Sequence, residues 1–127
     1  MPQHSYRQEP EPRPKTPYIP VTVKNIFSST PKEFLCEALL DTGSDFTIFP
    51  LRELEAIGLQ PIGDDMVLQG VSYARVRPFA ASLVIGDKQI LATPLGWNHN
   101  ISILGRDVLN LWRIDFDGPL SEFTVYQ

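Results

Sequence analysis

The sequence contains very few of the residues that form disulfides and metal sites. Its 127 residues include one cysteine, Cys36, and two histidines, His4 and His99. A single cysteine excludes an intrachain disulfide and is typical of proteins in a reducing compartment. Two histidines so far apart in the sequence are too few for a zinc site. We therefore expect neither a metal nor another cofactor.

Clusters of basic residues and long apolar runs are missing as well. The 11 Lys and Arg residues stand against 15 Asp and Glu residues, which gives a net charge of −4, and no run of Lys or Arg occurs. This pattern argues against a nucleic-acid surface. No apolar stretch approaches the roughly 20 residues that span a bilayer, and the N-terminus has no apolar segment typical of a secretory signal. We expect a cytoplasmic protein that binds neither nucleic acid nor membrane.

The composition is that of a globular domain with one unusual end. Apolar residues make up 43% of the chain and charged residues 20%, and 127 residues suffice for one modest core. Six of the 12 prolines, however, lie within the first 20 residues, where apolar residues recur with no period. This predicts a Pro-rich, disordered tail over residues 1–17, followed by a single folded domain over residues 18–127.

From residue 18 onward the pattern is mainly β. Two short helices are predicted, one over residues 50–58, between Pro50 and Gly58, and one over residues 105–112, which carries an apolar stripe. Many short strands with little helix predict a small closed or sandwich-like β fold. Short apolar or alternating runs bounded by turn residues predict these strands, within residues 18–25, 33–41, 46–49, 64–90, 90–97, 101–104, 112–116 and 123–127.

The segment LLDTGSDFTIFP, residues 39–50, places a carboxylate at the end of an apolar strand. A charged Asp is rarely buried without a partner, so Asp41 either opens an ordinary Asx turn or is the purpose of the segment. Gly43 allows a tight turn, the Thr42 hydroxyl can bond to the backbone, and the Ser44 hydroxyl can donate to the carboxylate. So held, Asp41 can act as a general base on water. A second carboxylate that shares a proton with it would supply the acid.

Two motifs together resemble those of a known family. ALLDTGSDFTIFP at residues 38–50 and SILGRDVLNLW at residues 102–112 are similar to the signature segments of the retropepsins, the single-domain aspartic proteases of the retroviral type. An apolar pair precedes Asp-Thr-Gly-Ser in the first segment, and Ile103-Leu104-Gly105 matches the second half of the signature. The resemblance covers roughly residues 18–115. It implies a mainly β fold, a small closed β-barrel with one or two short helices, that forms a dimer.

The resemblance implies an aspartic endopeptidase with Asp41 as the catalytic residue. Thr42, Gly43 and Ser44 would support the active-site turn, and no metal or cofactor would be needed. Since the chain has only one Asp-Thr-Gly and is too short for two pepsin-like lobes, the second Asp41 must come from a second copy. The implied partners are a second subunit in a homodimer and a polypeptide substrate. The alternative is a protease-like fold used as a dimerising or peptide-binding module, with cleavage weak or lost.

The family pattern also implies an ion pair between the arginine of the Gly-Arg segment and an acidic residue just beyond the catalytic turn. In this sequence the two partners are Arg106 and Asp45. Arginine suits the role because its planar fork can hold a carboxylate in two parallel hydrogen bonds. We expect a structural, partly buried pair; the alternative is that Arg106 is a solvated helix residue.

The flap that covers a retropepsin cleft is expected at Gly70, Val71, Ser72 and Tyr73. Flaps of this family are usually richer in glycine, and Gly70 would equally suit an ordinary hairpin. Cys36 lies within an apolar strand and is interpreted as a packing residue rather than a nucleophile. No nucleophile-elbow pattern supports a serine triad.

Overall fold

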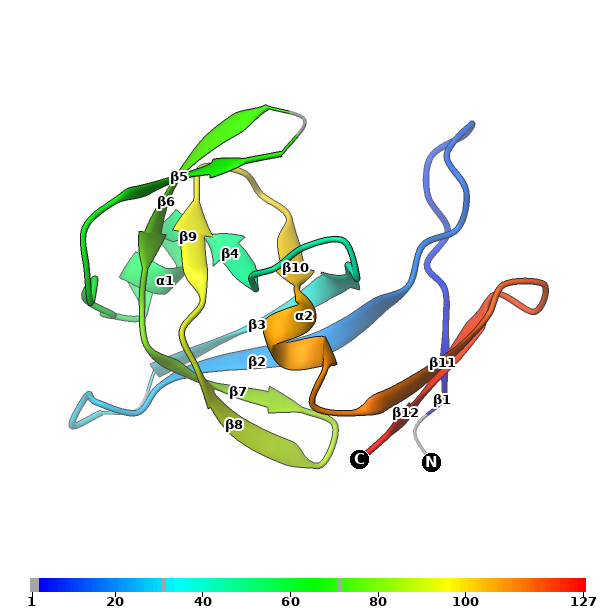
Figure 1. Ribbon diagram of the computed structural model, residues 1–127. Helices are drawn as coiled ribbons and strands as arrows, with labels where there is room; N and C mark the ends of the chain where they lie inside the picture. Colours follow the sequence, from blue (N-terminus) through cyan, green and yellow to red (C-terminus); the bar gives the residue numbers. More distant parts are fainter. Residues whose placement is uncertain (1–2, 31, 71) are drawn as a thin grey trace.

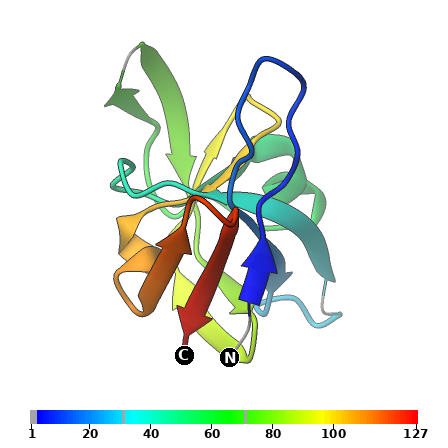
Figure 2. The ribbon, with the colours of Figure 1, turned by 90° about the vertical axis from the view of Figure 1, so that its right-hand side faces the viewer.

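The computed structural model describes residues 3–30, 32–70 and 72–127 (Figure 1). Within these residues two helices, α1 (Leu51–Ala56) and α2 (Arg106–Leu109), accompany two β-sheets. The smaller sheet, seen from its side of the molecule in Figure 2, has the order β1 (Gln3–Ser5), β12 (Glu122–Tyr126), β11 (Arg113–Asp117). The larger sheet has nine strands in the order β5 (Met66–Gln69), β6 (Tyr73–Pro78), β9 (Leu95–Trp97), β4 (Ile48–Pro50), β10 (Ser102–Leu104), β3 (Lys32–Leu40), β2 (Tyr18–Asn25), β7 (Ala81–Ile85) and β8 (Lys88–Ala92).

The mainly β character is confirmed, but the nine-stranded sheet is not the closed barrel that was expected. β5 and β8 are its two edges, and no described residue pairs one edge with the other. Figure 1 shows the β5–β6 hairpin at one end of the fold and the β7–β8 hairpin at the opposite end. Since a barrel requires its first and last strands to pair, the sheet curls around the core without closing. In the part of the chain that is described, no helix has the length and apolarity needed to cross a membrane.

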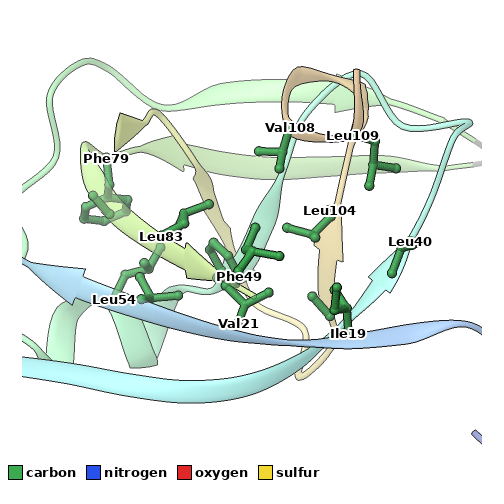
Figure 3. Close-up of a cluster of buried hydrophobic side chains, with 14 of the residues drawn as sticks. Ile19, Val21, Leu40, Phe49, Leu54, Phe79, Leu83, Leu104, Val108 and Leu109 are labelled. Atoms are coloured by element: carbon green, nitrogen blue, oxygen red, sulfur yellow. The ribbon is translucent and has the colours of Figure 1, made fainter. Parts of the chain in front are cut away.

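The alternation of apolar residues along the strands builds one main core. Val21 and Val23 of β2 are fully buried in one cluster with Phe49 of β4 and Leu54 of α1. Figure 3 shows Val21 beside Phe49. α1 starts directly after Pro50, whose fixed φ suits a helix start, and it ends before a glycine with positive φ. The helix predicted over residues 50–58 is therefore present in a shorter form. Leu54 is completely enclosed, which fixes α1 against the sheet.

Parallel pairing of β3 with β10 brings the two sequence motifs together. Ile103 pairs with Leu39, and Leu104 pairs with Leu40. The end of β3, which leads into Asp41, therefore lies beside the end of β10, which leads into α2. α2 is shorter than the helix predicted over residues 105–112, because the chain turns after it into β11. Two segments far apart in the sequence thus form one edge of the candidate site.

The N-terminal segment is ordered, so the prediction of a disordered tail over residues 1–17 is wrong for residues 3–17. β1 pairs antiparallel with β12, and His4 stands opposite Phe123. Arg7 and Thr16 then exchange backbone hydrogen bonds and close a loop over residues 7–16. The composition of this segment suggested a solvated tail. It could not reveal the pairing, because β12, the strand that pairs with the segment, lies at the other end of the chain.

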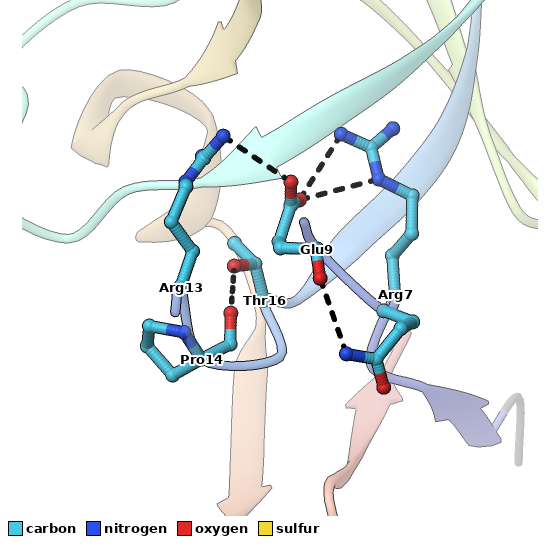
Figure 4. Close-up of polar contacts among 6 residues, drawn as sticks. Arg7, Glu9, Arg13, Pro14 and Thr16 are labelled. Atoms are coloured by element: carbon cyan, nitrogen blue, oxygen red, sulfur yellow. Dashed lines mark hydrogen bonds and ion pairs between the residues drawn. The ribbon is translucent and has the colours of Figure 1, made fainter. Parts of the chain in front are cut away.

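A buried carboxylate fixes this N-terminal loop (Figure 4). Glu9 is only 6% exposed, and its carboxylate accepts hydrogen bonds from Arg7 and pairs with Arg13 at 3.5 Å. The Arg7 guanidinium also lies over the ring of Tyr18, 3.5 Å from its centroid. A buried carboxylate is tolerated when cations pair with it. These contacts join the loop to the start of β2.

The surroundings of His4 predict that the docking of β1 is sensitive to pH. Its ring stacks on Phe123 with the ring centroids 4.9 Å apart, and its Nε2 is buried without a hydrogen-bond partner among the described residues. Burial lowers the pKa of His4 below its ordinary 6.5, and the negative charge of Glu37 opposes this effect only in part. A proton on a buried, unpartnered imidazole is unfavourable, so the protonated ring favours the released strand.

Acidification should therefore loosen β1. Because the pKa of His4 is lowered in the docked state, docking is fully stable above the ordinary histidine pKa and weakens as the pH falls below it. Going from about pH 7.5 to about pH 5 should speed hydrogen exchange of the β1 amides, after correction for intrinsic exchange rates. His4→Phe keeps an aromatic ring against Phe123 and should lose this pH response. The same acceleration in the variant would show that another group titrates.

Candidate active site

Asp41 occupies the first position after β3, in a turn fixed by the backbone. Its N–H donates to the Leu104 carbonyl at 3.0 Å, which continues the β3–β10 pairing by one residue. Its Oδ1 accepts from the Gly43 N–H at 2.9 Å, and its carbonyl accepts from the Ser44 N–H at 3.1 Å. A Cβ at Gly43 would lie 3.2 Å from Oδ1 and crowd this arrangement. The carboxylate is thus held in one direction while remaining partly exposed.

The two hydroxyl groups of the turn do not make the hydrogen bonds that the sequence suggested. The Ser44 Oγ donates to the Phe46 carbonyl at 2.7 Å, so the predicted hydrogen bond from Ser44 to the Asp41 carboxylate is wrong. The carboxylate receives a backbone N–H from Gly43 instead. The Thr42 hydroxyl makes no hydrogen bond within the described residues, while the Thr42 carbonyl accepts from Arg106 at 3.1 Å. Backbone groups, more than hydroxyls, hold the turn.

Arg106 joins α2 to the turn. Its Nη2 forms an ion pair with Asp45, and its Nη1 donates to the Thr42 carbonyl. The structure therefore brings Arg106 and Asp45 together, as the resemblance implied. The side chains are 46% and 67% exposed, however, so the expectation of a partly buried pair is wrong for the single chain. The turn lies at the surface, where water reaches both charges.

We expect this exposed pair to add little to the stability of the single chain. In a double-mutant cycle of Arg106→Lys and Asp45→Asn, the coupling energy should stay below about 1 kcal/mol, because solvent screens the charges. Urea unfolding of the four proteins at low protein concentration measures this energy. A coupling on the order of 3 kcal/mol, the size found for buried pairs, would contradict the exposed placement.

A buried threonine that sequence reasoning missed links the two motifs. Thr47 is fully buried; its Oγ1 donates to Asp107 at 2.7 Å and accepts from the Gly105 N–H at 3.1 Å. The Thr47 N–H donates to the other Asp107 oxygen at 3.0 Å. A Cβ at Gly105 would collide with the Phe46 backbone, so the close approach requires glycine there. In the sequence, this contact was signalled only by the polar Thr47 within the otherwise apolar run FTIF, residues 46–49.

A cleft of about 560 Å³ opens beside this turn. Its lining includes Asp41 and Asp45 from the turn, residues of the β5–β6 hairpin, and Trp97 and His99. The Trp97 Nε1 donates to the Ile101 carbonyl at 2.9 Å, which steadies the loop between β9 and β10. Six apolar and six polar or acidic side chains line the cleft, apolar atoms make up most of its exposed surface, and no Lys or Arg is among the described lining residues. The apolar side chains are those of Phe46, Ile48, Leu68, Ala74, Trp97 and Ile103.

The β5–β6 hairpin stands where a flap was expected. Gly70 and Ser72 line the cleft, and the Gly70 N–H donates to the Ser72 carbonyl at 3.0 Å across the tip. Tyr73 is 72% exposed and does not line the cleft, and Val71 lies outside the described residues. Two of the four predicted flap residues therefore face the site. The hairpin is joined to the body through β6 and β9.

Cys36 is not among the described residues that line this cleft. Cys36 packs against the main core from β3, where burial raises the pKa of its thiol despite a hydrogen bond to Ser102. A protonated thiol is a poor nucleophile, which agrees with the interpretation of Cys36 as a packing residue. Within the described ranges, no group of three or more His, Cys, Asp and Glu side chains is placed to hold a metal ion.

No protein-family model and no curated protein sequence matches this chain. Among solved structures, its fold is similar to that of the EIAV protease in complex with the inhibitor HBY-793, with a TM-score of 0.54. The identity is 21%, and the match covers 76% of this chain and 86% of the viral one. At this identity the likeness concerns the fold alone. The chain has the fold of a retroviral protease.

Proposed function

We propose that this protein is an aspartic endopeptidase that works as a homodimer, with Asp41 of each copy at the two-fold axis. The position of Asp41 carries the proposal. Its carboxylate borders the cleft, is oriented by the Gly43 N–H, and has no Lys or Arg beside it among the described lining residues. A carboxylate whose sole role was to close a turn would have no reason to border a cleft. The retroviral-protease fold supports the same chemistry.

In the proposed mechanism the two Asp41 carboxyl groups share one proton, since like charges this close cannot both be ionised. The ionised group takes a proton from a water molecule, whose oxygen attacks the carbonyl carbon of the peptide bond. The protonated group donates a hydrogen bond to the carbonyl oxygen as the tetrahedral intermediate forms. The carboxyl group that took the proton from water then gives it to the leaving nitrogen, and the C–N bond breaks as the carbonyl re-forms. One pair of carboxyl groups thus supplies both base and acid.

The proposed substrate is an extended polypeptide lying between the turn and the β5–β6 hairpin. Ile48, Leu68, Trp97 and Ile103 would accept apolar side chains next to the scissile bond, because burying apolar surface is favourable. The hairpin would close over the chain and exclude water from the reacting groups.

Activity should require the dimer, because each copy holds only half of the acid–base pair. The purified protein should cleave an unfolded protein, and its specific activity should fall on dilution below the dimer dissociation constant. A statine inhibitor, whose hydroxyl mimics the tetrahedral intermediate, should block cleavage. A monomer in sedimentation experiments at concentrations that give the full rate would exclude a shared site. Peptide binding without cleavage at any concentration would favour the binding-module alternative.

A further inference from the structure

Among the described residues that line the cleft, His99 is the one whose side chain can carry a positive charge. Asp41 and Asp45 supply negative charge, and no Lys or Arg is included. A histidine side chain ordinarily changes its charge between about pH 5 and 8. One proton on His99 therefore decides whether this part of the wall opposes an acidic ligand or attracts it.

A contact with Trp97 holds the His99 ring at the wall of the cleft. The two rings meet edge to face, with their centroids 4.8 Å apart and an interplanar angle of 81°, which is a geometry that aromatic pairs favour. The Trp97 Nε1 in turn donates to the Ile101 carbonyl, so a hydrogen bond spans the loop that carries His99. Trp97 is the last residue of β9, which pairs with β4 and β6. The ring therefore has a defined place although His99 is exposed.

The His99 imidazole is not neutralised by another side chain of the described chain. Neither ring nitrogen takes part in a hydrogen bond or salt bridge with a described residue, and Asp45, the exposed acid of the cleft, already pairs with Arg106. Asn100 of the same loop borders a separate cavity. The charged side chains of that cavity are Arg7, Glu37, Arg52 and Glu53. A protonated His99 is thus left to pair with a group that enters the cleft.

We infer that His99 is a specificity-determining residue, which selects an acidic side chain of the polypeptide substrate when its imidazole is protonated. The inference rests on the proposed endopeptidase function and names the class of substrate that the cleft takes below neutral pH. A Glu or Asp side chain beside His99 would accept a charge-assisted hydrogen bond from the imidazolium N–H. Above about pH 7 the ring is neutral, the charges of Asp41 and Asp45 dominate, and a neutral side chain is favoured at the same place.

Matched pairs of peptides test this preference. Each pair is a fluorogenic peptide with an apolar scissile bond that carries either Glu or Gln at one position, and that position is moved along both sides of the bond in turn. At the position next to His99, the ratio of kcat/KM for the Glu peptide to that for the Gln peptide should rise about threefold from about pH 7.5 to about pH 5.5, the effect of an exposed ion pair. The Glu side chain of the peptide stays ionised in this range. The ratio cancels any change of rate that titration of Asp41 imposes on both peptides alike.

Variants of His99 show whether its proton is the cause. His99→Gln should give a ratio that no longer depends on pH. His99→Lys should prefer the Glu peptide at both pH values, because a lysine side chain keeps its charge throughout this range. His4→Phe is the matched control, since it removes the other histidine of the chain, which lies in β1, and its ratio should respond to pH as in the wild type. A pH response that survives in His99→Gln, or one that is lost in His4→Phe, overturns the inference.

Binding without turnover separates this inference from the proposed function. Calorimetric Kd values of the same peptides, measured on Asp41→Asn so that none is cleaved, should show the same ratio and the same dependence on pH. Cleavage in which no peptide position gives a ratio that depends on His99 overturns the inference and leaves the enzyme assignment intact. A Kd ratio that depends on His99 in a protein that cleaves nothing upholds the selection and overturns the assignment. A protein that neither binds nor cleaves any of the peptides overturns both.

Discussion

Asp41→Asn should abolish peptide cleavage while leaving the fold intact. The amide has nearly the volume of the carboxyl group, and its oxygen can still accept the hydrogen bond from the Gly43 N–H that holds the side chain. It cannot take a proton from water at neutral or acidic pH. Removing a general base of this kind costs on the order of 100-fold to 10,000-fold in rate. Because the variant dimer would lack both carboxyl groups, we expect the upper end of this range.

The measurement is kcat/KM on a fluorogenic peptide, together with the thermal midpoint of each protein. The midpoint should remain within a few degrees of the wild-type value, which shows that the loss is chemical. Mixing wild type with the variant gives a further test: mixed dimers hold one carboxyl group and should be inactive. Activity should then follow the square of the wild-type fraction. A variant that cleaves at nearly the wild-type rate would refute Asp41 as the catalytic residue.

The parts of the fold that follow local patterns were predictable from the sequence. The alternation at Val21 and Val23 predicted β2, and Pro50 with Gly58 bracketed α1. The motif pair placed Asp41 at a strand end and Arg106 at a helix start, where the structure has them. Each of these features is set by residues close together in the chain. For such features a single sequence carries the needed information.

Features set by distant residues, or by a choice among several nearby partners, were not predictable. Gln3 donates to Glu122 across nearly the whole chain, and β1 exists only because β12 offers it an edge. The burial of Glu9 depends on two arginines that composition counts as solvated. The Ser44 hydroxyl had two acceptors within reach of a turn, and spacing does not decide between them. Prolines suggested disorder, while tertiary pairing decided the outcome.

Thr47 offers the largest expected effect on stability, because its hydroxyl completes a buried connection between the two motifs. Thr47→Val keeps the shape and removes Oγ1. The Gly105 N–H would then lose its acceptor in a buried place, and Asp107 would lose one of its two donors. Leaving a buried donor unpaired costs about 1–3 kcal/mol, and the lost bond to Asp107 adds about 1 kcal/mol. We expect Thr47→Val to lower the free energy of unfolding by about 2–4 kcal/mol.

Thr47→Ser separates hydrogen bonding from packing. It keeps the hydroxyl and removes one buried methyl group, which should cost about 1 kcal/mol. Urea unfolding should therefore rank wild type above the Ser variant and the Ser variant above the Val variant. The reverse order would show that the methyl group, and not the hydroxyl, secures the site. Gly105 precedes Arg106, and Thr47 follows the turn that holds Asp41. The loss in Thr47→Val should therefore also loosen the Arg106 contact to the Thr42 carbonyl and reduce the proposed cleavage at temperatures where the chain is still folded.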